Sequence, residues 1–261
     1  EPESNTAIAR QDFYTDFDGS NDKVVFGTSM ASGLGDSYSA NQGLSVTCWF
    51  KNDGTTDGGL FQIGNNGGAG EFSFQVDQNN DLYFLLNGNG WHRKIAFTDT
   101  SSWHHVVCVY GSSQDNSKIY LDGESVGTAG GSFPSTLDFN GLHTTIGSYW
   151  NLIYRFNGKI TDVKVFNTEL TEAQVTELYK KPENTPSAVQ DNIVAWYPMS
   201  EGNPESPQSI VYDHSENKLG MKSYLIQGLI LIRMLQQLEP IGLQTDGLLV
   251  VVKLLLIVQQ E

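Results

Sequence analysis

Short runs of apolar residues, separated by glycine, asparagine, aspartate and serine, recur along the chain as far as Phe166. Residues 71–77 alternate apolar and polar side chains with a period of two, which is the pattern of a half-buried β-strand. Residues 44–51 and 106–110 are rich in β-branched and aromatic residues, which favour strands. Many short strands joined by turns predict an all-β protein.

Residues 168–180 break this alternation and predict a short helix. Thr168 or Thr171 can accept the hydrogen bond that caps the first turn, and Val175 lies among apolar residues at helical spacing. Pro182 ends the helix, because the residue before a proline avoids the helical conformation.

The composition supports many strands and limits the classes of ligand. The 27 glycines and the 11% of aromatic residues suit short strands connected by turns. Thirty acidic and fifteen basic residues give a net charge of −15, which disfavours binding to nucleic acid and to anionic membranes. A negative surface suits cations or neutral ligands. The acidic residues are scattered, as they are on a solvated surface.

The two cysteines, Cys48 and Cys108, each lie between apolar neighbours in a predicted strand, where buried free thiols are common. A disulfide would require the two strands to be adjacent and the protein to be secreted. The chain begins without an initiator methionine or a signal peptide, which indicates a fragment or a processed product.

Five segments follow one another in an order that is typical of one family. They are DFDGSNDKVVF (16–26), LSVTCWFK (44–51), SWHHVV (102–107), KIYLDG (118–123) and FNGKITDVKVF (156–166). Together they resemble the strands of the laminin-G-like, concanavalin A-like lectin family. This resemblance implies an all-β, jelly-roll β-sandwich of two antiparallel sheets over residues 12–181, with a short helix after the last strand.

The rest of the chain is predicted to lie outside that domain. Residues 1–11 are polar and predict a flexible lead-in, and the proline-containing segment 182–190 predicts a linker. Residues 191–220 resemble the start of a second module of the same family, cut short. Residues 221–261 form an atypical, leucine-rich tail.

Three interpretations of the tail are open. A membrane helix is disfavoured because Arg233, Glu239 and Asp246 interrupt the apolar residues before a run of ~18 is reached. An amphipathic helix is interrupted at Pro240. Out-of-frame translation is the third: residues 228–253, with free choice of synonymous codons, are compatible with a shifted text rich in turn residues. An intact reading frame in the gene would contradict that hypothesis.

Candidate sugar-binding residues lie in or beside the predicted turns, where an aromatic ring can stack on a sugar face. Polar neighbours could supply hydrogen bonds to sugar hydroxyls, although turn formation is their common role. The candidates are Trp91, Tyr149, Trp150 and Tyr154 for stacking and Asn66, His92 and Arg155 for hydrogen bonds.

The family resemblance also implies a structural calcium ion. Family members often hold Ca²⁺ through a carboxylate on the closing strand, and Asp162 occupies that position. Asp16, Asp18 and Asp22 are the available partners near the first strand. Such oxygen ligands are what Ca²⁺ takes, but these residues could equally shape a turn.

His104 and His105 follow Trp103 and could suggest catalysis or a metal. Adjacent strand residues point to opposite faces, so one metal cannot readily take both, and the resemblance implies a structural role. Family glucanases carry an E-x-D-x-x-E triplet on one strand, which is missing here. The sequence therefore predicts no enzyme; a glycoside hydrolase is the weaker alternative.

These features predict a non-catalytic recognition module that binds a glycan, within a larger modular phage, viral or bacterial surface protein. The alternative is a purely structural or protein–protein interaction module of a virion or adhesin. The expected partners are a glycan or a protein surface and other modules of the same polyprotein or particle, with no nucleic acid and no membrane span. The expected location is extracellular or on a virion surface.

Overall fold

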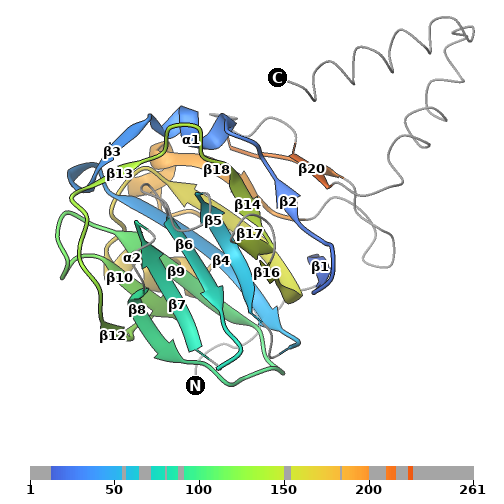
Figure 1. The fold of residues 1–261 in the computed structure, drawn as a ribbon. Coiled ribbons are helices and arrows are strands. Elements are labelled where there is room, and N and C mark those ends of the chain that lie inside the picture. Colours follow the sequence, from blue (N-terminus) through green and yellow to red (C-terminus); the bar gives the residue numbers. More distant parts are fainter. Residues whose placement is uncertain are drawn as a thin grey trace, which may run out of the picture. The chain divides into compact units, whose positions relative to one another are not determined.

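The computed structural model describes residues 13–54, 57–64, 72–79, 81–87, 91–149, 154–182, 184–199 and 210–215, and the backbone of 223–225 (Figure 1). Within these ranges the chain forms two main antiparallel sheets, sheet A and sheet B, which confirms the predicted all-β sandwich. In Figure 1 strands β5 to β8 of sheet B lie in front of β4 and β9 of sheet A.

Sheet A has seven strands and sheet B has nine. Sheet A runs in the order β1 (Thr15–Asp18), β17 (Asn157–Phe166), β4 (Leu44–Asn52), β9 (His104–Tyr110), β10 (Lys118–Leu121), β11 (Glu124–Val126), with β18 (Ile193–Tyr197) also paired to β17. Sheet B runs in the order β12 (Thr128–Ala129), β8 (Trp91–Ala96), β7 (Asp81–Leu86), β6 (Phe72–Val76), β5 (Gly58–Ile63), β14 (Thr144–Ile146), β2 (Val24–Val25), β20 (Ser223–Leu225), β19 (Ile210–Val211).

Smaller elements accompany the two sheets. Two short antiparallel pairs are β3 (Ser37–Ser39) with β13 (Thr136–Asp138), and β15 (Ser148–Tyr149) with β16 (Tyr154–Arg155). The helices are α1 (Ser29–Leu34), α2 (Glu172–Lys180) and the 3-10 helices η2 (Ala40–Gln42) and η3 (Ser187–Asn192).

The core lies between the inner faces of the two sheets. On β6, Phe72, Phe74 and Val76 are fully or almost fully buried, and Phe74 packs against Phe61 of β5 with ring centroids 5.9 Å apart. The alternation in the sequence therefore identified the inner face of this strand correctly. Cys48 and Cys108 are buried, free thiols on the adjacent strands β4 and β9.

Helix α2 covers part of the outer face of sheet A. Thr171 caps it, because its hydroxyl accepts the backbone N–H of Gln174 and the Gln174 side chain accepts the Thr171 N–H. Val175 and Leu178 of the helix are buried in a second apolar cluster with outward-facing residues of β9 and β10. The predicted helix is confirmed, with Thr171 rather than Thr168 as its cap.

The predicted boundary at 182–190 does not separate two modules. Strand β18 pairs with β17 in sheet A, and its residues Val194, Ala195 and Tyr197 belong to the main core. Residues 187–192 form η3, with Val189 buried against the α2 cluster. Within the described residues, 191–199 and 210–215 complete the first sandwich instead of opening a truncated second one. In the predicted tail, 221–261, residues 223–225 form β20 beside β2, and the other residues lie outside the description.

Strands β1 and β18 share one edge of β17. β1 pairs along Asn157–Ile160 and β18 along Val163–Phe166. The register of β17 shifts at the junction, where Asp162 has a positive φ of 52°. The Thr161 hydroxyl lies 2.7 Å from the carbonyl oxygen of Phe13 and 2.9 Å from that of Pro198, so it bonds the ends of both edge strands.

A buried polar network fixes β18 to β17. The Asp162 Oδ2 atom pairs with Lys164 Nζ at 2.5 Å, and Asp162 Oδ1 accepts the indole N–H of Trp196 at 2.7 Å. The ammonium of Lys164 also donates to the carbonyl of Pro182 and lies 5.2 Å from the centre of the Trp196 ring. A buried charge pair of this kind requires its partners, because desolvation of an unpaired charge is costly.

Candidate ligand-binding site

Two polar side chains of β6 are buried on the outer face of sheet B. Ser73 and Gln75 alternate with the core phenylalanines, so they point away from the core, yet only 0% and 7% of their surface is exposed. Ser73 Oγ and Gln75 Oε1 have no hydrogen-bond partner among the described residues. A buried polar atom without a partner costs about 1–3 kcal/mol, so these atoms are suited to receive the polar groups of a ligand.

Neighbouring strands continue this polar surface. In register, Ser73 lies beside Gln62 of β5, Gln75 lies beside Tyr83 of β7, and Tyr83 lies beside Lys94 of β8. Cross-strand partners on one face lie about 4.5–5.5 Å apart at Cβ. The outer face of β5 to β8 therefore carries a continuous row of amide, hydroxyl and ammonium groups.

The β15–β16 hairpin approaches this row because β5 begins with two glycines. A Cβ atom on Gly59 would lie 2.5 Å from the carbonyl carbon of Ser148, and one on Gly58 would lie 2.6 Å from Cα of Phe156. No other residue type fits at these positions without moving the backbone. The paired glycines thus place the hairpin against the start of β5.

The hairpin carries a stacked pair of tyrosines. The rings of Tyr149 and Tyr154 have centroids 4.8 Å apart and planes inclined by 17°. Burial raises the pKa of the Tyr149 hydroxyl, and the nearby Asp57 carboxylate raises it further, whereas hydrogen bonding to the Gln75 side chain acts in the opposite direction. Tyr149 thereby connects the hairpin to the polar row of β6, and Tyr154 is the more exposed ring of the pair.

Arg155 lies opposite Ser148 in the same hairpin. The Arg155 Nη1 atom and the Ser148 Oγ atom are buried and have no hydrogen-bond partner among the described residues. Desolvation by burial lowers the pKa of the Arg155 guanidinium. The hairpin therefore presents a donor group and a hydroxyl that are already partly removed from water.

The carboxylates near β6 and β7 are used within the fold. Asp77 accepts the backbone N–H groups of Asn79 and Asp81, at 2.9 and 3.0 Å. Asp57 accepts the backbone N–H of Gln78 at 2.9 Å, and Asp81 pairs with the ammonium of Lys94. These groups shape the turn between β6 and β7.

The structure brings together three of the predicted sugar-binding residues, Tyr149, Tyr154 and Arg155, on the β15–β16 hairpin. Trp91 lies on β8 opposite Leu85, and its side chain is outside the description. Trp150 and Asn66 lie outside the described residues.

His92, another predicted ligand residue, lies in the core. A register shift in the pairing of β7 with β8 changes the alternation at this position. His92 is 1% exposed and packs edge-on against Phe84 with centroids 5.7 Å apart. Burial lowers the pKa of its imidazole to about 4, so it is a neutral core residue.

The predicted calcium ligands do not form one site. Asp18 pairs with Asn157 of β17. Asn157 precedes Asp162 by five residues on this strand, a separation of about 16 Å at ~3.3 Å per residue. Asp162 is 3% exposed and is bonded to Lys164 and Trp196. In the parts of the chain that the structure describes, no group of three or more His, Cys, Asp or Glu residues could hold a metal.

The proposed first-strand ligands have other roles. Asp18 Oδ1 accepts the backbone N–H of Ser20 at 2.8 Å, and Asp22 Oδ2 accepts the backbone N–H of Asp18 at 3.1 Å. The carboxylate of Asp16 lies 3.6 Å from Lys159 Nζ. In this structure Asp18 and Asp22 therefore shape a turn, and Asp16 forms a surface ion pair.

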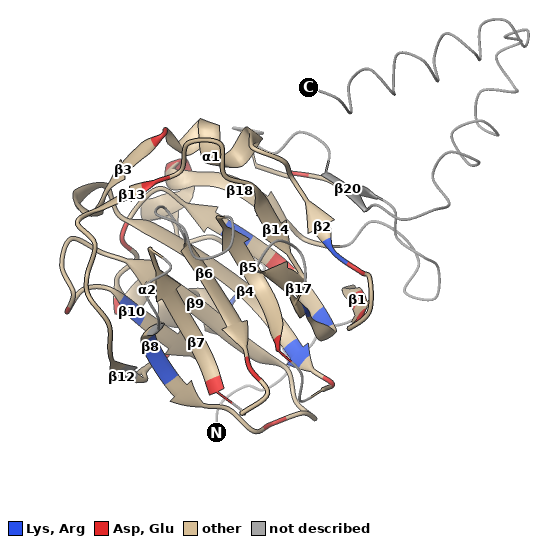
Figure 2. Ribbon diagram, in the orientation of Figure 1, with Lys and Arg blue, Asp and Glu red and all other residues tan. Residues whose placement is uncertain are grey.

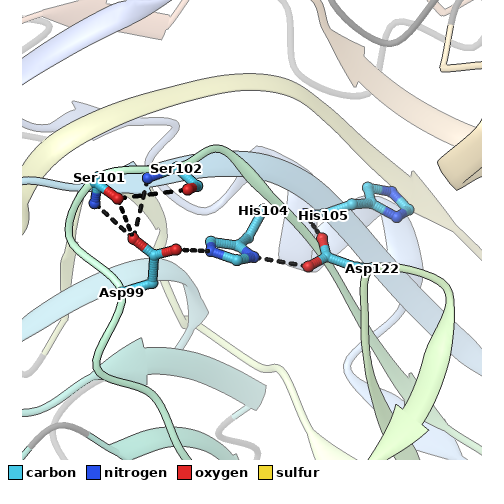
Figure 3. Close-up of polar contacts among 6 residues, drawn as sticks. All are labelled: Asp99, Ser101, Ser102, His104, His105 and Asp122. Carbon is cyan, nitrogen blue, oxygen red and sulfur yellow. Dashed lines mark hydrogen bonds and ion pairs between the residues drawn. The ribbon is translucent and has the colours of Figure 1, made fainter. Parts of the chain in front are cut away.

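His104 and His105 point to opposite sides of β9, as predicted (Figure 3). His104 Nδ1 lies 2.7 Å from Asp122 Oδ2, and Nε2 lies 3.3 Å from Asp99 Oδ2. The hydrogen bond to Asp122 is the main cause that raises the pKa of His104. This cluster fixes the start of β9 to the β10–β11 turn, because Asp122 also accepts the backbone N–H of His105.

The pKa of His105 is shifted in the opposite direction. The residue is buried on the outer side of sheet A, between Trp49 and Tyr179, with centroids 5.2 and 6.1 Å away. Burial lowers its pKa to about 4, and its Nε2 atom bonds the Thr47 hydroxyl. Both histidines therefore stabilise the fold.

A family model matches residues 18–176, which is more than half of the chain. It is a laminin G model described as the concanavalin A-like lectin/glucanases superfamily. The chain belongs to this superfamily. The resemblance inferred from the strand motifs is thereby confirmed, and the match covers β1 to β17 apart from the first residues of β1.

The chain is also similar to proteins of several kinds. The adhesion G-protein coupled receptor V1 of Danio rerio is 28% identical over 156 residues, 56% of this chain, and the match spans 2% of the receptor's length. A Bacteroides ovatus protein with a provisional assignment as a carbohydrate binding protein has a TM-score of 0.52 at 16% identity, covering 83% of this chain and 59% of its own. A heptameric pentraxin of Limulus polyphemus has a TM-score of 0.48 at 17% identity, covering 65% and 82%.

The structure also bears on the predicted absence of a membrane span. Among the described residues, no helix is long and apolar enough to cross a membrane.

Three residues of the candidate site were missed by sequence reasoning: Ser73, Gln75 and Ser148. The alternation of residues 71–77 already placed Ser73 and Gln75 on the outer face of their strand. Their burial could not be deduced, because an alternating strand does not specify what lies over its outer face.

Proposed function

We propose that this chain is a non-catalytic carbohydrate-recognition module that works outside the cell as part of a larger modular protein. The ligand binds the outer face of sheet B beside the β15–β16 hairpin. The observation that carries the proposal is the set of buried, unpartnered polar atoms on Ser73, Gln75 and Ser148. Sugars match such a site, because they combine many hydroxyl groups with an apolar face.

The tyrosine pair supports a sugar over other polar ligands. An exposed ring that is braced from behind by a second ring offers a rigid surface on which a sugar face can stack. Tyr154 is partly exposed and stacks on the buried Tyr149. The hydrogen-bonding row on β6 lies beside this ring pair, because the side chains of Tyr149 and Gln75 interact.

A binding rather than hydrolytic role is supported by the carboxylates of this face. Glycoside hydrolysis requires two carboxyl groups on either side of the sugar bond. On the described residues of β5 to β8 and their turns, Asp57 and Asp77 hold backbone N–H groups and Asp81 pairs with Lys94. A glycoside hydrolase remains the less favoured proposal.

The modular and extracellular context is supported by the relative in Danio rerio. Its description as an adhesion receptor, and the 2% of its length that this chain matches, fit a single module of a long cell-surface protein. The bacterial neighbour assigned to carbohydrate binding shares the fold over 83% of the chain. A module on a virion surface remains part of the same proposal.

The test is titration calorimetry of the full chain with a panel of neutral and charged mono- and disaccharides. We expect a Kd in the range of 10 μM to 10 mM for at least one sugar, and a loss of about tenfold or more in Gln75→Ala and Tyr154→Ala. Ser125→Ala, an exposed position on the edge strand β11, is the matched control. Binding that is unchanged by both site variants, or absent for every sugar, would contradict the proposal.

A second candidate, protein–protein interaction, is favoured by an aromatic group near sheet A. Phe13 is 46% exposed, and Tyr14 lies 5.8 Å from Trp103 between ring centroids. The Lys159 ammonium lies 5.5 Å from the centre of the Tyr14 ring. Aromatic residues of this kind are enriched at protein interfaces, so a failed sugar titration would make this surface the next one to examine.

A further inference from the structure

Two basic side chains lie close together beside the candidate site. Lys23 directly precedes β2, where Val24 pairs with Ile146 of β14. Two residues further along the chain, Ser148 pairs with Arg155. This register places Lys23 next to the hairpin. Burial lowers the pKa of the Lys23 ammonium, and the nearby charge of Arg155 lowers it further.

Neither cation has a carboxylate partner within the described residues. Three other lysines do: Lys94 pairs with Asp81, Lys159 with Asp53 and Lys164 with Asp162. The carboxylate of Asp22, the residue before Lys23, accepts the backbone N–H of Asp18 instead. In a chain with a net charge of −15, two adjacent cations without a counter-charge are unexpected. The acidic residues are dispersed over loops and strand ends (Figure 2). Their distribution therefore gives no reason for two unpaired cations to lie side by side.

The site around these cations is already partly desolvated. The Arg155 Nη1 atom and the Ser148 Oγ atom are buried without partners, and Ser148 itself is 0% exposed. Cross-strand partners present their side chains on the same face, so the guanidinium and the hydroxyl can contact one ligand group. A guanidinium binds a carboxylate or sulfate group of a ligand through two parallel hydrogen bonds. A neutral sugar hydroxyl cannot accept both of these bonds with the same strength.

We propose that the ligand is an acidic sugar, whose negatively charged group binds between Arg155, Lys23 and Ser148 while its ring contacts the polar row of β6. This inference rests on the proposed carbohydrate function and adds the charge of the ligand to it. The local cation pair takes precedence over the negative charge of the whole chain, because charges beyond the Debye length of about 8 Å are largely screened in physiological salt.

The experiment compares two sugars that differ at one carbon. Methyl β-D-glucuronide and methyl β-D-glucoside are titrated into the full chain at low and physiological salt. We expect the glucuronide to bind roughly tenfold tighter or more, because a hydrogen bond to a charged group is stronger than a neutral one. Raising the salt concentration should reduce this preference.

Site variants test the assignment of the residues. Arg155→Gln and Lys23→Gln should each bring the glucuronide affinity close to that of the glucoside. Arg155→Lys keeps the charge and should recover only part of the preference, since it cannot form the paired hydrogen bonds. The Ser125→Ala control should leave both affinities unchanged, and thermal melting without ligand checks that each variant is folded.

The outcomes separate the two proposals. If neither sugar and no other carbohydrate binds, the proposed function fails. If both sugars bind equally and Arg155→Gln changes neither, the acidic-sugar inference is wrong while the carbohydrate function stands. If inorganic sulfate competes as well as the glucuronide does, the cations bind simple anions and the inference is also overturned.

Discussion

The outer faces of the two sheets differ in what covers them. On sheet A, the outward-facing residues Val107 and Val109 are apolar, and they are covered by Leu178 and its neighbours on α2. On sheet B, the outward-facing residues Ser73 and Gln75 are polar and buried, and Ser73 Oγ and Gln75 Oε1 have no hydrogen-bond partner among the described residues. An apolar outer face is completed by the chain itself, whereas a buried polar outer face is suited to a ligand.

The largest effect is expected at the charge pair on the outer side of sheet A. Lys164→Ala leaves Asp162 buried without its counter-charge, and we expect the free energy of unfolding to fall by about 3–5 kcal/mol. Urea denaturation measures this change. The double variant Lys164→Met with Asp162→Asn, which removes both charges, should recover much of the loss; a single variant that loses less than about 1 kcal/mol would contradict the prediction.

A pair of variants tests the contrast between the two faces directly. Leu178→Ala removes a buried side chain from the covered face of sheet A and should destabilise the protein by about 2–5 kcal/mol without changing sugar affinity. Ser73→Ala removes a buried, unpartnered hydroxyl, so it should raise the free energy of unfolding by up to about 1–3 kcal/mol while weakening sugar binding. Equal losses of stability in the two variants would remove the distinction between the faces.

The smallest effect is expected from pH, through the adjacent histidines. The folded pKa of His104 is raised above 6.5, so its ion pairs with Asp99 and Asp122 stabilise the protein below pH 6.5 and are lost as the pH rises through the folded pKa. His104→Gln should therefore differ most from the wild type in unfolding free energy at pH 5–6, and the difference should shrink toward pH 8. A difference that does not vary with pH would refute this role.

His105, on the covered face, acts in the opposite direction. Its folded pKa of about 4 lies below 6.5, so the unfolded chain binds more protons between these values. Stability should then fall as the pH decreases from 6.5 to 4, and His92, which has a similarly lowered pKa, adds to the same trend. Urea denaturation at a series of pH values measures how the unfolding free energy changes with pH, for this effect and for His104.

Local patterns predicted the local structure well. The period of two in residues 71–77 gave the strand and its inner face, and the residues around Thr171 gave the helix. The pairing of strands that are distant in the sequence was harder to predict. The strand IVAWY (193–197) can open a new module or complete the edge of β17, and only the register with Val163–Phe166 decides between them.

The candidate site shows the same limit. Tyr149 and Arg155 could be predicted because an aromatic or a charged side chain beside a turn can stack on a sugar or bond to it. Ser73 and Gln75 were not, since an alternating strand specifies which way a side chain points but not what lies over it. His92 shows a related limit: it lies at a register shift in the pairing of β7 with β8, and its burial does not follow from its place beside a predicted turn.

The shared edge of β17 has a practical consequence for defining this module. The family match ends at residue 176, and a protein truncated there would lack β18. Its β17 would expose the backbone groups of Val163–Phe166 as an open template for pairing with another molecule. Truncation at the family boundary should therefore produce aggregation, and soluble expression should require the residues as far as 225, because β20 pairs with β2 in sheet B.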